Sequence, residues 1–171
     1  MGGDKFVAAV AGDDVETRLG DDLRNRWESL FDEVIGEVAS LEGAHELMTD
    51  LKDRGHVVVL ASSSIQKHLD HYLELLNARD VADAWTTSDD VDASKPEPDL
   101  VLVAFDKAGT QDAVMIGDTP WDVEAAARAG VKTISVLTGG FSEHELREAG
   151  AVGVFESVAD LRKHLDETPL S

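Results

Sequence analysis

The sequence predicts an α/β fold, in which a parallel β-sheet is flanked by helices and a purely helical segment comes first. From Leu41 onward, short β-branched runs alternate with amphipathic helical stretches. Such alternation produces right-handed βαβ units and therefore parallel strands. Up to residue 38, apolar residues recur only at helical spacing, without a strand pattern. The length of 171 residues, 43% of them hydrophobic, suffices for one core.

The helical segment, residues 1–38, is predicted to contain two helices. The shorter one carries Phe6, Val7 and Val10 and ends at a turn around Gly12. The longer one has apolar residues at three- and four-residue spacing, namely Leu19, Leu23, Trp27, Leu30, Phe31, Val34, Ile35 and Val38.

The remaining segment, residues 39–171, is predicted to alternate strands with helices. Strands are expected at 57–60, 114–116, 131–137 and 152–155, and helices at 41–51, 65–76, 96–109, 120–130, 143–150 and 158–165. Unbroken β-branched runs such as 57–60 are typical of strands that are buried on both faces. Ser64, Thr119 and Ser142 stand where helix N-caps are expected.

The composition excludes several classes of protein. Lys and Arg number 15 against 35 Asp and Glu, which gives a net charge of −20 that repels nucleic acid and anionic lipid. We interpret this charge as a solubilising or salt-adapted surface. The absence of cysteine excludes disulfides, thiolate zinc sites and cysteine nucleophiles. Without a signal peptide or an apolar run of about 18 residues, a soluble cytoplasmic protein is expected.

Polar side chains follow the predicted strands at their carboxyl ends. Ser62 and Ser63 come after 57–60, Asp118 and Asp122 come after 114–116, and Lys95 opens the helix between these strands. Each alone could be an ordinary turn, cap or surface residue. Because the carboxyl ends of parallel strands form one binding edge, we expect them to converge. Hydroxyl, amide and lysine donors beside carboxylates suit a phosphate and a magnesium ion.

The order Ser62, Lys95-Pro96 and Gly117-Asp118-x-x-x-Asp122 resembles motifs two to four of the haloacid-dehalogenase-like hydrolase superfamily, in its phosphoglycolate-phosphatase-like branch. The resemblance implies a Rossmann-like sheet, with residues 1–38 as the remnant of a helical cap domain and 39–171 as the hydrolase core. It also implies hydrolysis of a small phosphomonoester through a phospho-aspartate with Mg²⁺ as cofactor.

The resemblance also implies a role for each matching residue. Ser62, assisted by the Ser63 amide, would hydrogen-bond the phosphoryl group, and Lys95 would neutralise charge on it. Asp118 would ligate Mg²⁺, and Asp122 would support the metal or orient Lys95. Asp4 and Lys5 open the cap remnant and could contact the substrate, although Asp4 as the N-cap of the first helix is the interpretation that we favour.

The first motif of the family, Asp-x-Asp-Gly-Thr/Val, is absent from this sequence. In the family, this motif supplies the nucleophile and follows the central strand of the sheet. Neither Asp13-Asp14 nor Asp21-Asp22 follows a buried strand. We therefore expect a chain that begins within the cap domain and shows little phosphatase activity alone. The alternatives are a sugar phosphomutase of the same family and a non-catalytic, acidic α/β interaction module.

Overall fold

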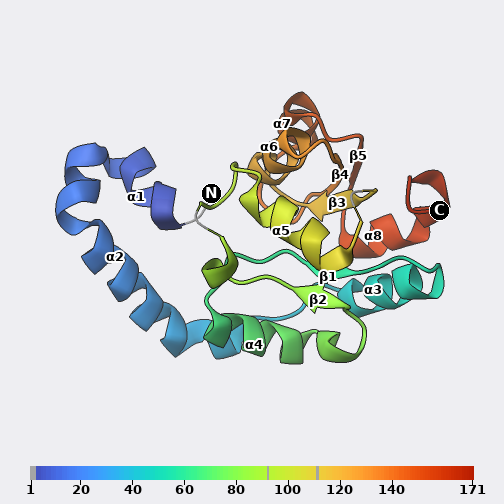
Figure 1. Ribbon diagram of the computed structural model, residues 1–171, viewed down its shortest axis with the longest axis horizontal. Coiled ribbons are helices and arrows are strands. Elements are labelled where there is room, and N and C mark those ends of the chain that lie inside the picture. The colour runs from blue at the N-terminus through green and yellow to red at the C-terminus, as the bar shows by residue number, and fades with distance from the viewer. Residues whose placement is uncertain (1–2, 92, 111) are drawn as a thin grey trace. The chain divides into compact units, whose positions relative to one another are not determined.

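The computed structural model describes residues 3–91, 93–110 and 112–171, and the chain divides into two compact units, residues 1–39 and 40–171 (Figure 1). The first unit is helical, as predicted. It consists of α1 (Gly3–Ala11), α2 (Asp13–Val34) and a 3₁₀ turn at Ile35–Glu37. Gly12 separates the two helices with φ of 87°, a left-handed conformation that favours glycine.

The apolar face predicted for α2 is largely exposed. Its exposed members are Leu19, Leu23, Trp27, Leu30 and Val34, which keep 42–60% of their surface. Trp27 stacks on Phe31 with ring centroids 4.9 Å apart, so the aromatic pair is packed within the helix itself. Among the described helices, none combines the length and the apolar character that a membrane crossing demands.

The described residues of the second unit form five parallel strands in two sheets, which confirms the predicted α/β class. In the smaller sheet, β1 (Val59–Leu60) pairs with β2 (Ala84–Trp85). In the larger sheet, β4 (Lys132–Val136) lies between β3 (Val114–Gly117) and β5 (Gly153–Phe155). The strand predicted at 57–60 is shorter than expected, and β2 was not predicted.

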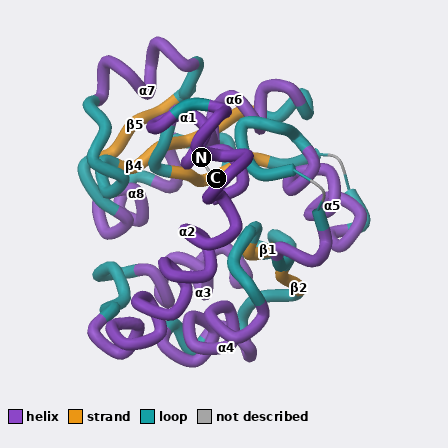
Figure 2. The backbone as a smooth tube through the Cα atoms, turned by 90° about the vertical axis from the view of Figure 1, so that its left-hand side faces the viewer, coloured by secondary structure: helices purple, strands orange, loops and turns teal. Residues whose placement is uncertain are grey.

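Helices flank the two sheets of the second unit (Figure 2). They are α3 (Ala44–Asp53), α4 (Gln66–Leu75), α5 (Asp99–Ala108), α6 (Pro120–Arg128), α7 (Glu143–Ala149) and α8 (Val158–Lys163), with 3₁₀ turns at Ala78–Asp80, Ser88–Asp90 and Leu165–Glu167. Thr119 and Ser142 are the N-caps of α6 and α7, as predicted, and each forms a capping box, which was predicted for Ser142 only.

The prediction that Ser64 caps the following helix is wrong. The N-cap of α4 is Ile65, which makes no side-chain cap hydrogen bond. The Ser64 amide instead donates to Ser62 Oγ at 3.1 Å, so this serine belongs to the turn that leaves β1.

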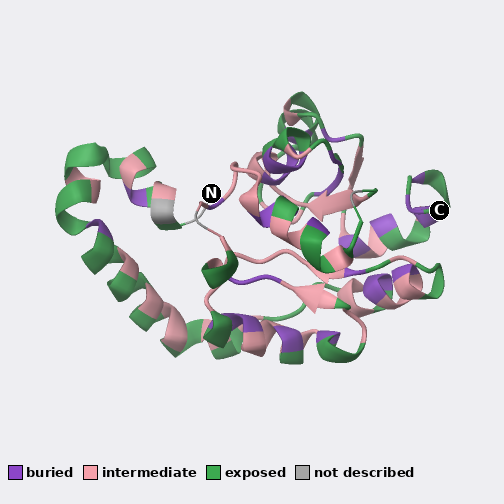
Figure 3. Ribbon diagram, in the orientation of Figure 1, coloured by how far each residue is buried: buried purple, intermediate pink, exposed green. Residues whose placement is uncertain are grey.

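Buried segments, purple in Figure 3, lie along α3, α4 and α8, and the main cluster of buried side chains also includes two residues of β4. Ile134 and Val136 pack on one face of the sheet with Leu73 of α4 and Leu161 of α8, and each of these side chains is at most 4% exposed. A second cluster joins residues of α5 and α6 to Met115 of β3. Because helices flank the sheets, the polar loops at the carboxyl ends are the accessible part.

A cavity of about 870 Å³ lies between the two sheets within the second unit. Its walls include β1 and β3, and most of the lining side chains of these strands are apolar. Among the described residues, β1 pairs only with β2, and β3 pairs only with β4. Each of the two strands therefore presents one backbone edge without a strand partner toward this cavity.

Candidate functional site

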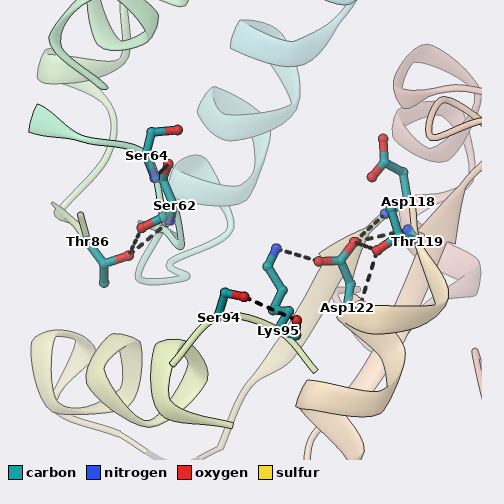
Figure 4. A network of polar contacts seen from close by, with 8 residues as sticks. All are labelled: Ser62, Ser64, Thr86, Ser94, Lys95, Asp118, Thr119 and Asp122. Atoms are coloured by element: carbon teal, nitrogen blue, oxygen red, sulfur yellow. Dashed lines mark hydrogen bonds and ion pairs between the residues drawn. The ribbon is translucent and has the colours of Figure 1, made fainter. Parts of the chain in front are cut away.

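The Ser62 loop is anchored to the strand beside it. The Ser62 amide donates to Thr86 Oγ1 at 2.9 Å, and the Thr86 hydroxyl donates back to the Ser62 carbonyl at 2.8 Å. Thr86 directly follows β2 and is fully buried. This reciprocal pair holds the backbone of Ser62 at the carboxyl end of β1 (Figure 4).

Lys95 forms an ion pair with Asp122 at the centre of the site. Lys95 Nζ lies 2.5 Å from Asp122 Oδ1, and the two side chains are only 23% and 5% exposed. The lysine precedes α5, which packs on the smaller sheet, and the aspartate lies in the first turn of α6, which packs on the larger sheet, so the pair joins segments from the two sheets. The lysine is therefore held in place before any ligand arrives (Figure 4).

Asp122 also caps its own helix. Its Oδ2 accepts hydrogen bonds from the amides of Asp118 and Thr119, at 3.2 and 3.0 Å, and from the Thr119 hydroxyl at 2.8 Å. Burial raises the pKa of Asp122, but the charge and hydrogen bond of Lys95, together with those hydrogen bonds, lower it more, so its pKa lies below the ordinary value. Asp122 is therefore an anion that is engaged on both oxygens.

Only glycine fits at position 117, directly before Asp118. A Cβ on Gly117 would lie 2.6 Å from Asp122 Cβ, which is closer than side-chain atoms approach one another. Any larger residue at the end of β3 would displace the carboxylate that holds Lys95.

Asp118 is held separately, by a residue that the sequence analysis missed. Thr138, which follows β4, donates its hydroxyl to Asp118 Oδ2 at 2.9 Å. The Asp118 carboxylate points away from Asp122 (Figure 4). The signal that could have found Thr138 is its position: Thr138-Gly139-Gly140 follows a strand at the same carboxyl edge as the other polar loops.

The structure brings most of the predicted site residues together. Ser62, Lys95, Asp118 and Asp122 all line the cavity between the sheets, and Thr138 lines it as well. The loops thus line one cavity although they follow strands of two separate sheets, and the chemical role of each residue remains a prediction. Ser63 is half-buried in the same loop and is not part of the lining.

Asp4 and Lys5 belong to the first unit, so their predicted contact with a substrate remains a prediction. The side chain of Asp4 lies outside the described residues. Helix α1 begins at Gly3, which places Asp4 inside the first turn rather than at the N-cap, contrary to the interpretation favoured from the sequence.

The carboxylate oxygens that line this cavity are suitable ligands for magnesium. Mg²⁺ keeps several waters and binds proteins through one or two carboxylates together with substrate phosphates, rather than through a closed protein cage. Asp118 supplies one such carboxylate at the cavity wall. No cluster of three or more His, Cys, Asp or Glu side chains suited to a metal occurs in the described part of the chain, so a preformed cage is absent there.

Comparison with known proteins agrees with this geometry. Residues 6–136 match the haloacid dehalogenase-like hydrolase family. A pyrophosphatase, PpaX, of Bacillus velezensis is 31% identical over 101 residues, which are 58% of this chain and 47% of that protein. The chain thus spans about half the length of the curated relative that it matches.

Solved structures show the same fold. A hydrolase from Pseudomonas syringae superposes with a TM-score of 0.80 at 32% identity, over 86% of this chain and 68% of that one. A HAD family hydrolase from Deinococcus radiodurans, solved with bound phosphate and sodium, gives a TM-score of 0.72 at 26% identity, over 87% and 69% of the two chains. The family match covers most of this sequence, including all three polar loops. The chain therefore belongs to the haloacid dehalogenase-like hydrolase family.

Proposed function

We propose that the chain carries most of the active site of a magnesium-dependent phosphomonoester hydrolase that works through a phospho-aspartate. The observation that carries this proposal is the convergence of Ser62, Lys95 and Asp118 on one cavity at the carboxyl ends of β1 and β3. A hydroxyl, an ammonium and a carboxylate around one cavity provide a donor, a cation and a metal ligand for a phosphate group.

Each residue has a separate task in this mechanism. Ser62 donates its hydroxyl to a phosphoryl oxygen, and Lys95 offsets the negative charge that grows during transfer. Asp122 keeps the ammonium of Lys95 at the site through their 2.5 Å contact. Asp118 would hold Mg²⁺, which when bound screens the charge of the phosphoryl oxygens from an attacking anion.

The nucleophilic aspartate of this mechanism comes from a segment other than the described strands. We place that segment in the cavity between the sheets, where β1 and β3 each present a backbone edge that no described strand pairs. A parallel strand there would hydrogen-bond to both edges and join the two sheets into one. Its carboxyl end would then lie between Ser62 and Asp118, which suits a nucleophile.

The first unit is proposed as part of a cap domain that selects the substrate. Its two helices form a unit distinct from the core. The substrate class is a small phosphorylated metabolite, and Lys5 in α1 is the proposed contact for a second anionic group.

The decisive experiment restores the nucleophile and measures hydrolysis of para-nitrophenyl phosphate with and without MgCl₂. We expect little turnover from the chain alone. A version extended at its N-terminus with a strand ending in Asp-x-Asp-Gly-Thr is expected to hydrolyse the ester only with magnesium. The matched control carries Asn in place of the first Asp of that motif and is expected to be inactive.

Three outcomes would contradict the proposal. Robust magnesium-dependent hydrolysis by the unextended chain would show that the nucleophile lies within it. A folded extended chain that stays inactive with magnesium would favour the non-catalytic interaction module. Conversion of a sugar monophosphate into its positional isomer without release of inorganic phosphate would instead identify a phosphomutase.

Variants of the extended chain test the individual roles. Lys95→Ala should lower kcat more than it raises KM, because the charge that the ammonium meets is largest in the transition state. Asp118→Asn should raise the magnesium concentration needed for half-maximal activity, because a neutral amide replaces an anionic ligand. Unchanged magnesium dependence of Asp118→Asn would refute its assignment as a ligand.

A further inference from the structure

We propose that Thr138 and Gly139 are positioning residues that fix the Asp118 carboxylate for its cation. The inference rests on the proposed function, because it assigns a task to the loop after β4 within the same site. It stands on two independent contacts, one made by a side chain and one made possible by the absence of a side chain.

The first contact is the hydrogen bond from Thr138 Oγ1 to Asp118 Oδ2, at 2.9 Å. It follows from strand register. Gly117 of β3 lies opposite Ser135 of β4 in a parallel pair, so the residues that follow the two strands emerge side by side. The threonine hydroxyl is thus supplied by the neighbouring strand and restrains rotation of the Asp118 side chain.

The two aspartates of the site differ in what holds them. Asp122 is engaged by the ammonium of Lys95, which neutralises its charge. Asp118 is restrained by a neutral hydroxyl, which leaves its full negative charge for another cation. A hydroxyl is therefore suited to position a metal ligand, since a lysine at the same place would compete with the metal.

The second contact concerns Gly139. A Cβ built on this residue would lie 2.2 Å from the Asp118 carbonyl oxygen and 2.9 Å from Asp118 Cγ. The backbone atom cannot move aside as the end of a flexible side chain could. Gly139 is not among the glycines with positive φ, so the collision, and not a left-handed backbone, is the argument against alanine there. The backbone of Gly139 therefore packs closely against both the backbone and the side chain of Asp118.

The test compares Thr138→Val, which keeps the shape and removes the hydroxyl, with Thr138→Ser, which keeps the hydroxyl. The first readout is the pair of Hα–Hβ couplings of Asp118, measured by NMR on the chain as it exists. We expect one dominant rotamer in the parent chain and in Thr138→Ser, and averaged couplings in Thr138→Val. The second readout is Mn²⁺ affinity from water-proton relaxation, which we expect to fall about tenfold in Thr138→Val, as for other partners that orient a metal ligand.

Gly139→Ala has a matched control in Gly36→Ala. A Cβ on Gly36 meets nothing within 4 Å, and Gly36 also lies outside the positive-φ set. We expect Gly139→Ala to shift the Asp118 amide resonance and weaken Mn²⁺ binding, and Gly36→Ala to change neither. Far-UV circular dichroism checks that each variant is folded, and Thr138→Val decides the proposal if Gly139→Ala does not fold.

The outcomes separate the two proposals. If Thr138→Val leaves the Asp118 couplings unchanged, the positioning role is overturned, whatever the change in Mn²⁺ affinity. If the couplings average while Asp118→Asn binds Mn²⁺ as tightly as the parent chain, Thr138 positions Asp118 but the proposed metal ligand is wrong. If Thr138→Val shows averaged couplings and weaker Mn²⁺ binding, and Thr138→Ser shows neither change, the positioning role of Thr138 and the assignment of Asp118 as metal ligand are both supported.

Discussion

Removing the Asp122 carboxylate tests whether the site is also a structural element of the fold. In Asp122→Ala, the ammonium of Lys95 loses its partner, and the amides of Asp118 and Thr119 lose their acceptor. Breaking a buried ion pair costs about 3–5 kcal/mol. We expect the lower end of that range for the pair, about 3 kcal/mol, because Lys95 is 23% exposed and can turn toward water. Loss of a helix cap adds about 1 kcal/mol.

The free energy of unfolding should therefore fall by about 4 kcal/mol, a large fraction of the total for a domain of this size. Urea unfolding followed by far-UV circular dichroism measures this change. Asp70→Ala is the matched control, because Asp70 pairs with Arg79 at the surface with both side chains 44% exposed, and we expect little change there. A loss below about 1 kcal/mol in Asp122→Ala would refute the reasoning, since the pair would then behave as a surface salt bridge.

The same carboxylate gives a pH dependence with a defined sign. The pKa of Asp122 in the folded chain lies below its unfolded value of about 3.9. Its stabilisation is therefore fully present above about pH 4 and is lost as the pH falls through the folded pKa. In urea titrations between pH 3 and 7, the difference in unfolding free energy between the parent chain and Asp122→Asn should stay constant above about pH 4 and shrink below it. A difference that grows on acidification would contradict the assignment.

Three further substitutions test the core and its polar contacts by urea unfolding. Leu73→Ala should lower the unfolding free energy by about 3 kcal/mol because Leu73 is fully buried in the main cluster, and a loss below about 1 kcal/mol would show a loosely packed core. Thr133→Val should raise it by about 1 kcal/mol, because the buried Thr133 hydroxyl makes no hydrogen bond within the described ranges; a decrease would reveal a partner. Asp83→Ala should lower it by about 1 kcal/mol, because Asp83 accepts from Lys52 Nζ and the Val58 amide; no change would mean that solvent replaces both contacts.

Elements with a local signal were predicted well. Helical periodicity found α1 and α2, and the expected N-caps Thr119 and Ser142 marked the starts of α6 and α7. The polar loops after the strands were found because the carboxyl ends of parallel strands share one edge. These signals depend only on neighbouring residues, so the sequence contains them directly.

Features that depend on tertiary packing were missed. Strand β2 is only Ala84–Trp85, too short for a hydrophobic pattern, and pairing with β1 defines it. The contact from Thr138 to Asp118 arises from the register of β3 and β4, which no local pattern specifies. Periodicity identified the helix containing Trp27 but not its environment, and Trp27 is 60% exposed. The sequence thus indicates which side chains lie on one helix face, while burial depends on what packs against that face.

The two open strand edges beside the cavity have a consequence for hydrogen exchange. Strand β4 is hydrogen-bonded on both sides, to β3 and to β5, so its amides can exchange with deuterium only when the larger sheet opens. The amides of β1 and β3 that face the cavity lack this protection from any described strand. Deuterium uptake should therefore be slowest around Ile134 and faster at the cavity-facing amides. Slowing at those amides alone would report directly that another segment has joined the sheet.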